Sequence, residues 1–114
     1  MNVIIRHRNV SPSKALDAHC RDHVARAVKP FAQGIDSVEV VLADLNGPRK
    51  GPGHACRVLI RLTAGGEVMF VSKDSDFYRA SHRAATGAGR HLARVIDKAR
   101  TRSHERFEPP NGAA

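Results

Sequence analysis

The spacing of hydrophobic residues changes along this chain from two residues to three or four and back again, and few folds fit that order. Residues 2–9 alternate, with Val3 and Ile5 on one side and Arg6 and Arg8 on the other. Alternation of this kind is typical of a strand that buries one of its two faces. The chain is therefore predicted to open with a half-buried strand.

A helix is predicted to follow this strand. Ser11-Pro12 favours its start, because a serine at the N-cap accepts a bond from a free amide and proline suits the first helical position. Gln33-Gly34 is expected to end it. Between these limits, a spacing of three and four residues predicts an amphipathic helix with Leu16, Cys20, His23, Val24, Ala27, Val28 and Phe31 on its inner side.

Three more alternating segments predict three further strands. The first spans residues 37–44, the second runs over 56–62, and the third returns through 68–70. Gly65-Gly66, between the second and the third, predicts a hairpin turn. Residues 46–54 are rich in glycine and proline, so they cannot extend a strand and are expected to form a mobile loop.

A second, longer helix is predicted over residues 75–104. Two aspartates and a serine at 74–76 can cap its start and suit the positive end of the helix dipole. Residues 107–114 are expected to form a flexible tail, which leaves residues 1–106 as a single domain. The apolar positions of this helix fall on one face, namely Phe77, Ala84, Ala88, Leu92, Val95 and Ala99.

The predicted element order is β-α-β-β-β-α, which is an α+β fold. The connection through the first helix is long enough for a right-handed parallel crossover, whereas the later loops suit antiparallel pairing. We expect a four-stranded mixed sheet with both helices packed on one face. The other face is expected to be open and basic, because it would present Arg6, Arg8, Arg57, Arg61 and Lys73.

Size and composition exclude several classes of protein. A chain of 114 residues can form one core, but not a catalytic domain with a separate binding domain. Cys20 and Cys56 show no Cys-x-x-Cys spacing, so we expect free thiols in a reducing environment. The longest early apolar run, residues 3–5, is too short for a signal peptide or a membrane span. We therefore expect a soluble, cytoplasmic protein with no membrane partner.

Charge is the strongest functional signal in the composition. The net charge is +8, and the aromatic residues are only four Phe and one Tyr, which favours binding through charge over base stacking. Residues 77–106 hold eight cations against two anions, a net of +6. At about 100° per residue, an arc of about 60° opposite the apolar face contains Arg79, Arg83, Arg90 and Arg94.

These four arginines, called the arginine stripe below, have two interpretations. They can be a solvated face whose cations suit the C-terminal end of the helix dipole. Against this, the stripe has few acidic partners at helical spacing, and the planar fork of arginine matches phosphate bidentately. We favour phosphate binding, to structured RNA rather than DNA, because nothing here is built to read bases. The glycine-rich loop lacks the P-loop pattern, so it is not expected to bind a nucleotide phosphate. Its Arg49-Lys50 pair is interpreted as a flexible cationic contact.

Enzyme or metal chemistry has little support in the sequence. His19 and His23 have the spacing at which two imidazoles share a metal, but no motif places a third ligand. Cys20 has no identifiable orienting group or oxyanion loop for a nucleophilic role. Gly87 and Gly89, inside the last helix, indicate close packing or a bend more than a close approach to a partner. We expect no enzyme activity, no cofactor, no metal and no small-molecule substrate.

Several strings resemble one known family in their order and spacing, from residue 1 to about residue 102. They are Met1-Asn2-Val3-Ile4-Ile5, Ser11-Pro12-Ser13-Lys14-Ala15-Leu16, Val38-Glu39-Val40-Val41-Leu42 and Asp74-Ser75-Asp76-Phe77-Tyr78-Arg79-Ala80. The resemblance is to the ribosome hibernation-promoting factor and ribosome-associated inhibitor family. It implies a double-stranded-RNA-binding-like fold that occupies the decoding region of the small ribosomal subunit and silences ribosomes in stress or stationary phase.

The resemblance also implies the site and the partners. Contacts with 16S ribosomal RNA are expected from Arg79, Arg83, Arg90, Arg94, Arg8, Arg57 and Arg61, with Lys73 and Arg49-Lys50 as weaker candidates. By this resemblance, the chain is not expected to join two ribosomes through the separate dimerisation domain of long family members alone. Whether a second hibernation factor is a partner in ribosome pairing is left open by the sequence. The alternative is a protein-binding regulator whose open basic sheet face docks an acidic partner such as a transcription factor.

Overall fold

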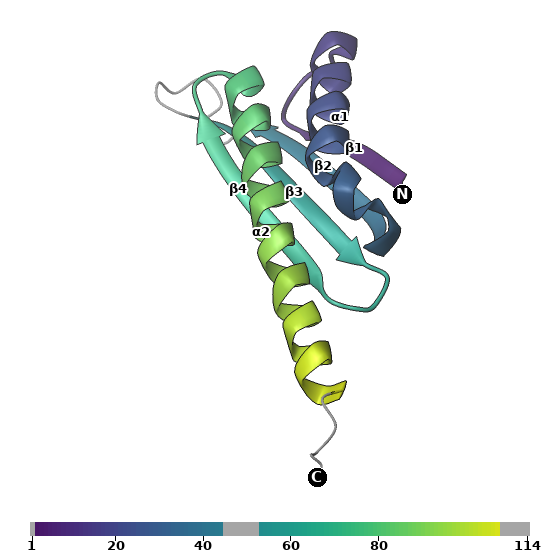
Figure 1. Ribbon diagram of the computed structural model, residues 1–114. Coiled ribbons are helices and arrows are strands. Elements are labelled where there is room, and N and C mark those ends of the chain that lie inside the picture. The colour runs from purple at the N-terminus through teal and green to yellow at the C-terminus, as the bar shows by residue number, and fades with distance from the viewer. Residues whose placement is uncertain (1, 45–52, 108–114) are drawn as a thin grey trace.

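The computed structural model describes residues 2–44 and 53–107. Strands and helices follow one another in the predicted order (Figure 1). They are β1 (Asn2–Arg8), α1 (Lys14–Val28), the short 3-10 helix η1 (Lys29–Gly34), β2 (Ile35–Asp44), β3 (His54–Leu62), β4 (Glu67–Asp74) and α2 (Phe77–Phe107).

The four strands form one mixed sheet in the order β1-β2-β3-β4. The crossover through α1 makes β1 parallel to β2, and the remaining pairs are antiparallel. Both helices lie on the same face of this sheet (Figure 1). The predicted α+β fold is confirmed, and the opposite face is left without a helix in the part of the chain that the structure describes.

The first helix begins later than predicted. Its N-cap is Ser13, whose hydroxyl accepts a hydrogen bond from the backbone N–H of Leu16 at 3.3 Å. The prediction that Ser11 is the cap is therefore wrong, because the extended backbone needed at that position occurs at Ser13 (φ −132°, ψ 120°). At the other end, Pro30 lacks the N–H that an α-helix requires, and the chain continues as η1.

The third strand begins earlier than predicted. His54 pairs with Asp44 of β2 and with Asp74 of β4, so it belongs to β3 and not to the loop. Its ring also stacks on Phe77, with ring centroids 4.0 Å apart. Most of the predicted loop, residues 46–52, lies outside the described residues.

The second helix spans 31 residues and its start is capped as predicted. The Asp76 carboxylate accepts a hydrogen bond from the backbone N–H of Tyr78 at 3.0 Å. At the far end the helix runs past the sheet (Figure 1) and ends at Phe107, one residue into the predicted tail. Beyond it, residues 108–114 lie outside the described residues. None of the described helices is long and apolar enough to span a membrane.

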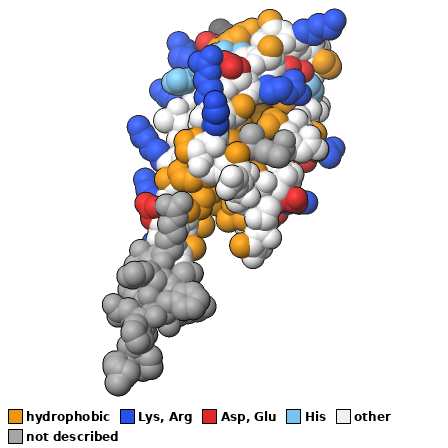
Figure 2. Space-filling model, turned by 45° about the vertical axis from the view of Figure 1, so that its right-hand side comes forward, with side chains coloured by type: hydrophobic (Ala, Val, Ile, Leu, Met, Phe, Trp, Pro, Cys, Tyr) orange, Lys and Arg blue, Asp and Glu red, His pale blue; other side chains and the backbone are white. Residues whose placement is uncertain are grey.

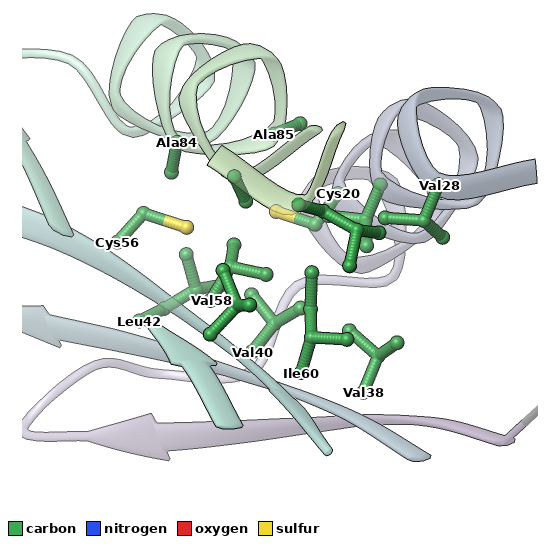
Figure 3. Packing of buried hydrophobic residues seen from close by; sticks show 14 of the residues in the cluster. Cys20, Val28, Val38, Val40, Leu42, Cys56, Val58, Ile60, Ala84 and Ala85 are labelled. Carbon is green, nitrogen blue, oxygen red and sulfur yellow. The ribbon is translucent and has the colours of Figure 1, made fainter. Parts of the chain in front are cut away.

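The core lies between the sheet and the two helices (Figure 3). Alternate residues of the strands pack against residues of α1 that are spaced three and four apart, as predicted. The buried face of α2 is made mainly of small side chains, which lets the helix approach closely, and it comprises Ala80, Ser81, Ala84, Ala85, Ala88 and Leu92. Ala99 is exposed, contrary to the prediction. The C-terminal part of α2 runs past the sheet (Figure 1), so the apolar face of the helix is not covered along its whole length.

Glycines serve two purposes in this fold. Gly65 and Gly66 have φ of +98° and +91°, the left-handed region that a tight hairpin turn requires. Gly89 allows helix packing, because a Cβ there would lie 3.1 Å from the backbone oxygen of Ala27. At Gly87 a Cβ would lie 2.3 Å from the ring of Phe70 on β4. The predicted packing role of the α2 glycines is confirmed, though Gly87 packs on a strand.

Both cysteines are free and fully buried, which leads to a testable prediction. Burial raises the pKa of Cys20 and raises the pKa of Cys56 from 9.0 to about 12. Because the thiolate is the reactive species, we expect neither thiol to react with a thiol reagent in the folded protein at neutral pH. Both should react in urea, and rapid labelling of the native protein would contradict the burial.

The same pKa shift predicts the pH dependence of stability. The folded state favours the neutral thiol of Cys56, so its contribution is complete below the ordinary thiol pKa of 9.0. We expect stability to decline as the pH rises from there toward about 12. Urea unfolding of Cys56→Ala should show a weaker decline over that range than the wild type.

Candidate nucleic-acid interface

The arginine stripe lies on the exposed side of α2, as predicted, and all four of its side chains are exposed. The helix presents them because its opposite side, from Ala80 to Leu92, is buried against β3, β4 and α1. Lys and Arg side chains project around the outline of the molecule, and apolar side chains gather between them (Figure 2). The stripe therefore offers its cations to solvent.

Asp74 divides the stripe into two halves. Its carboxylate lies 3.1 Å from Nε of Arg79 and 3.5 Å from Arg83. Desolvation acts to raise the pKa of Asp74, but the backbone N–H of Asp76 and the two guanidinium groups outweigh it and lower that pKa. This partner lies outside the helical spacing to which the prediction of few acidic partners applies, because Asp74 comes from the end of β4 and not from α2.

The second half of the stripe has no such partner. Arg90 and Arg94 are exposed, and no acid among the described residues forms an ion pair with either. With His91 they line a hollow of about 290 Å³ between α2 and β4, whose other walls are Phe70 and Gly87. These two guanidinium groups are free to bind an anion without first breaking an ion pair.

Replacing Asp74 with asparagine is expected to strengthen binding to RNA. Asparagine still accepts the hydrogen bond from the backbone N–H of Asp76 (3.1 Å), but it releases Arg79 and Arg83 from a negative partner. Exposed ion pairs are worth about 0.2–1 kcal/mol, so we expect a gain of up to about fivefold, with a steeper salt dependence, in fluorescence anisotropy with an RNA hairpin.

A matched control separates this effect from net charge. Asp22 pairs with Arg26 on α1 at 3.2 Å, and Asp22→Asn changes the charge of the protein by the same amount. If both asparagine variants gain equally, the position of Asp74 beside the stripe is irrelevant and the prediction fails.

The sheet face without helices presents its five predicted cations, since all point away from the core. The strand register aligns Arg8 with Lys73 across the sheet, and it aligns Arg6 with Arg57. Arg61 lies near the end of the sheet that is farthest from Arg8. Two acids on the same face pair with three of these cations. Glu39 lies 2.6 Å from Arg6 and 3.8 Å from Arg57, and Glu67 lies 3.1 Å from Arg61.

A hollow of about 380 Å³ opens among these residues on the β1 side of the sheet. Its lining includes Arg6, Arg8, Glu39 and Arg57. The Nε atom of Arg57 is buried there without a hydrogen-bond partner in the described part of the protein. An anion could approach this hollow, but Glu39 already neutralises part of its charge.

The sheet face is also more apolar than predicted. Ile4, Met69 and Val71 point away from the core and are 40%, 52% and 44% exposed. They occupy the same alternating positions as the cations, so the strand pattern already contained this signal. The open face carries its predicted cations, but the surface is mixed, because these apolar side chains lie among them.

Three histidines meet where α1 and α2 pack. The ring of His23 lies 4.2 Å from that of His19 and 5.0 Å from that of His82, centroid to centroid. Burial, together with the neighbouring His19 and His82, lowers the pKa of His23. In the part of the chain that the structure describes, no three metal-ligating side chains are arranged to hold a metal ion.

The remaining predicted RNA contact, Arg49-Lys50, lies outside the described residues.

Comparisons with known proteins agree with this architecture. The sequence model of the family described as sigma 54 modulation protein / S30EA ribosomal protein matches residues 3–100. No curated protein matches the chain significantly. A ribosomal subunit interface protein from Coxiella burnetii has a similar structure, with a TM-score of 0.72 and 13% identity over 85% of this chain and 99% of that one. The N-terminal domain of Protein Y from Thermus thermophilus gives a TM-score of 0.67 and 23% identity, over 83% of this chain and 99% of that one.

Proposed function

Since the chain belongs to the sigma 54 modulation protein / S30EA ribosomal protein family, we propose that it binds the small ribosomal subunit and inhibits translation. In this proposal it binds phosphates of 16S ribosomal RNA and occupies the decoding region, where it blocks messenger and transfer RNA sterically. The action requires a shaped, charged surface and no chemical step.

The observation that best supports RNA binding is the free half of the arginine stripe. Arg90 and Arg94 are exposed and have no acidic partner in the described part of the chain, so binding a phosphate costs them no existing ion pair. Arginine donates two parallel hydrogen bonds to a phosphate and remains charged at all relevant pH values. Arg79 and Arg83 extend the same surface once they exchange their ion pairs with Asp74 for contacts with phosphate.

Sedimentation with purified ribosomal subunits tests the proposal. We expect the protein to move with the small subunit at low salt and to be released as salt rises, because phosphate binding is driven by counterion release. Translation in vitro should be inhibited under the conditions that retain the protein on the subunit. Recovery only in ribosome-free fractions at low salt, with normal translation, would refute the proposal.

A second candidate function is favoured by the mixed sheet face. Ile4, Met69 and Val71 expose apolar surface beside cations, a combination that suits an acidic protein partner such as a transcription factor better than RNA. Affinity capture after nuclease treatment separates the two functions. An association through RNA disappears, whereas one through the sheet face survives and is lost in the variant Ile4→Ser/Met69→Ser.

A further inference from the structure

We propose that the hollow between α2 and β4 binds one unstacked nucleotide of a single-stranded RNA segment, with the base on Phe70 and the phosphate on Arg90 and Arg94. This inference rests on the proposed RNA-binding function and adds a specific ligand to it. It adds the stacking of one base on an aromatic side chain, whereas the composition of the chain favours RNA binding through charge.

The ring of Phe70 can lie against α2 because residue 87 is a glycine. A Cβ at this position would lie 2.3 Å from the ring of Phe70, so any other residue would have to displace the ring. Phe70 points to the helix side of the sheet and packs on the margin of the core, where it remains half-buried. Since β4 is an edge strand, no further strand of the described sheet covers the outer side of this ring.

The charged wall lies directly beside the ring. Arg90 and Arg94 are one helical turn apart, which places their Cβ atoms about 5–6 Å from each other on one side of the helix. Neither has an acidic partner among the described residues, whereas Arg79 and Arg83 share Asp74. The uncompensated positive charge of the stripe therefore lies beside the ring of Phe70, and His91 adds a further polar group.

The size and the lining of the hollow suit a single nucleotide. A hollow of about 290 Å³ is comparable with the smallest ligand pockets, roughly 300 Å³. Bases within a duplex have both faces covered by their neighbours, so only an unpaired base can stack on a side chain. The combination of an aromatic face with two guanidinium groups fits a base and its phosphate.

Fluorescence anisotropy with the full chain tests this site. The two probes are a labelled short oligouridylate, which stays single-stranded, and a labelled RNA duplex of the same length. Phe70→Leu should weaken oligouridylate binding at least about fivefold, because stacking of one base on an aromatic side chain supplies a gain of that order or more. Duplex binding, which uses the arginines alone, should be unchanged.

Phe31→Leu is the matched control. Phe31 is also half-buried against the core but does not line the hollow, so this variant should bind both probes like the wild type. Thermal unfolding monitored by circular dichroism shows whether each variant is folded. Equal oligouridylate affinity in wild type and Phe70→Leu, or an equal loss for both probes, would overturn the nucleotide site.

A measurement on the wild type covers the case in which Phe70→Leu unfolds. In an NMR titration, uridine 5′-monophosphate should shift the ring resonances of Phe70, whereas inorganic phosphate should shift only those near the guanidinium groups. Identical shifts with both ligands would overturn the site. Failure of the wild type to sediment with small subunits would instead refute the proposed function, and that result does not depend on Phe70.

Discussion

Replacing Arg90 and Arg94 together with alanine is expected to weaken binding to the small ribosomal subunit by roughly 10- to 100-fold, since hydrogen bonds to charged groups are worth about 1.5–3 kcal/mol each before solvent screening. The salt dependence should also become shallower, because fewer counterions are released per protein bound. Quantitative sedimentation over a series of salt concentrations measures both effects.

The first half of the stripe supplies a matched control for this prediction. Arg79→Ala/Arg83→Ala removes the same charge from the same helix, but from arginines that already share Asp74. We expect a smaller loss of affinity for this variant, because the wild type must give up those ion pairs before it binds phosphate. Equal losses in the two double variants would mean that binding depends on net charge and not on which arginines are free.

Replacing Leu92 with alanine is expected to destabilise the fold by about 2–5 kcal/mol, the usual cost of truncating a buried leucine. Among the described side chains of α2, Leu92 is the largest that is fully buried, and in the sequence it lies between Arg90 and Arg94. A loss of this size is a large part of the stability of a small domain, about 5–15 kcal/mol. Urea unfolding followed by circular dichroism measures it.

Met69→Ala is the comparison for Leu92→Ala. Met69 is of similar size but lies 52% exposed on the sheet face without helices, so its truncation should cost less than about 1 kcal/mol. Leu92→Ala should lose subunit binding only in proportion to the protein that is unfolded. Loss of binding by a fully folded Leu92→Ala protein would indicate that Leu92 positions the adjacent arginines.

Most of the fold could be predicted because the relevant signals are local. Val38, Val40 and Leu42 alternate in the sequence, and their strand buries all three on one face. Boundaries were less accurate, as at Ser13 and His54, because a cap or a strand pair depends on a specific hydrogen bond and not on the hydrophobic pattern. The exposed position of Ala99 shows the same limit, since the pattern does not reveal where the sheet ends beneath the helix.

The candidate site could be predicted in outline only. The arginine stripe follows from the helical period, and all four side chains are exposed as expected. The pairing of Arg79 with Asp74 was missed because the acid lies at the end of β4, outside the helical spacing that was considered. The prediction for the sheet face rests on its charged positions and therefore does not include exposed Ile4, which shares the face of Arg6.

By itself, the sequence determined the order and type of the elements, the face that each one buries and the side of α2 on which the arginines lie. These properties depend on the period of the backbone, which is a property of neighbouring residues. Only the tertiary structure decided which arginines are free and where an aromatic ring is accessible. Both depend on β4 lying beside α2, which brings Asp74 to Arg83 and Phe70 to Gly87, and no local pattern specifies those distances.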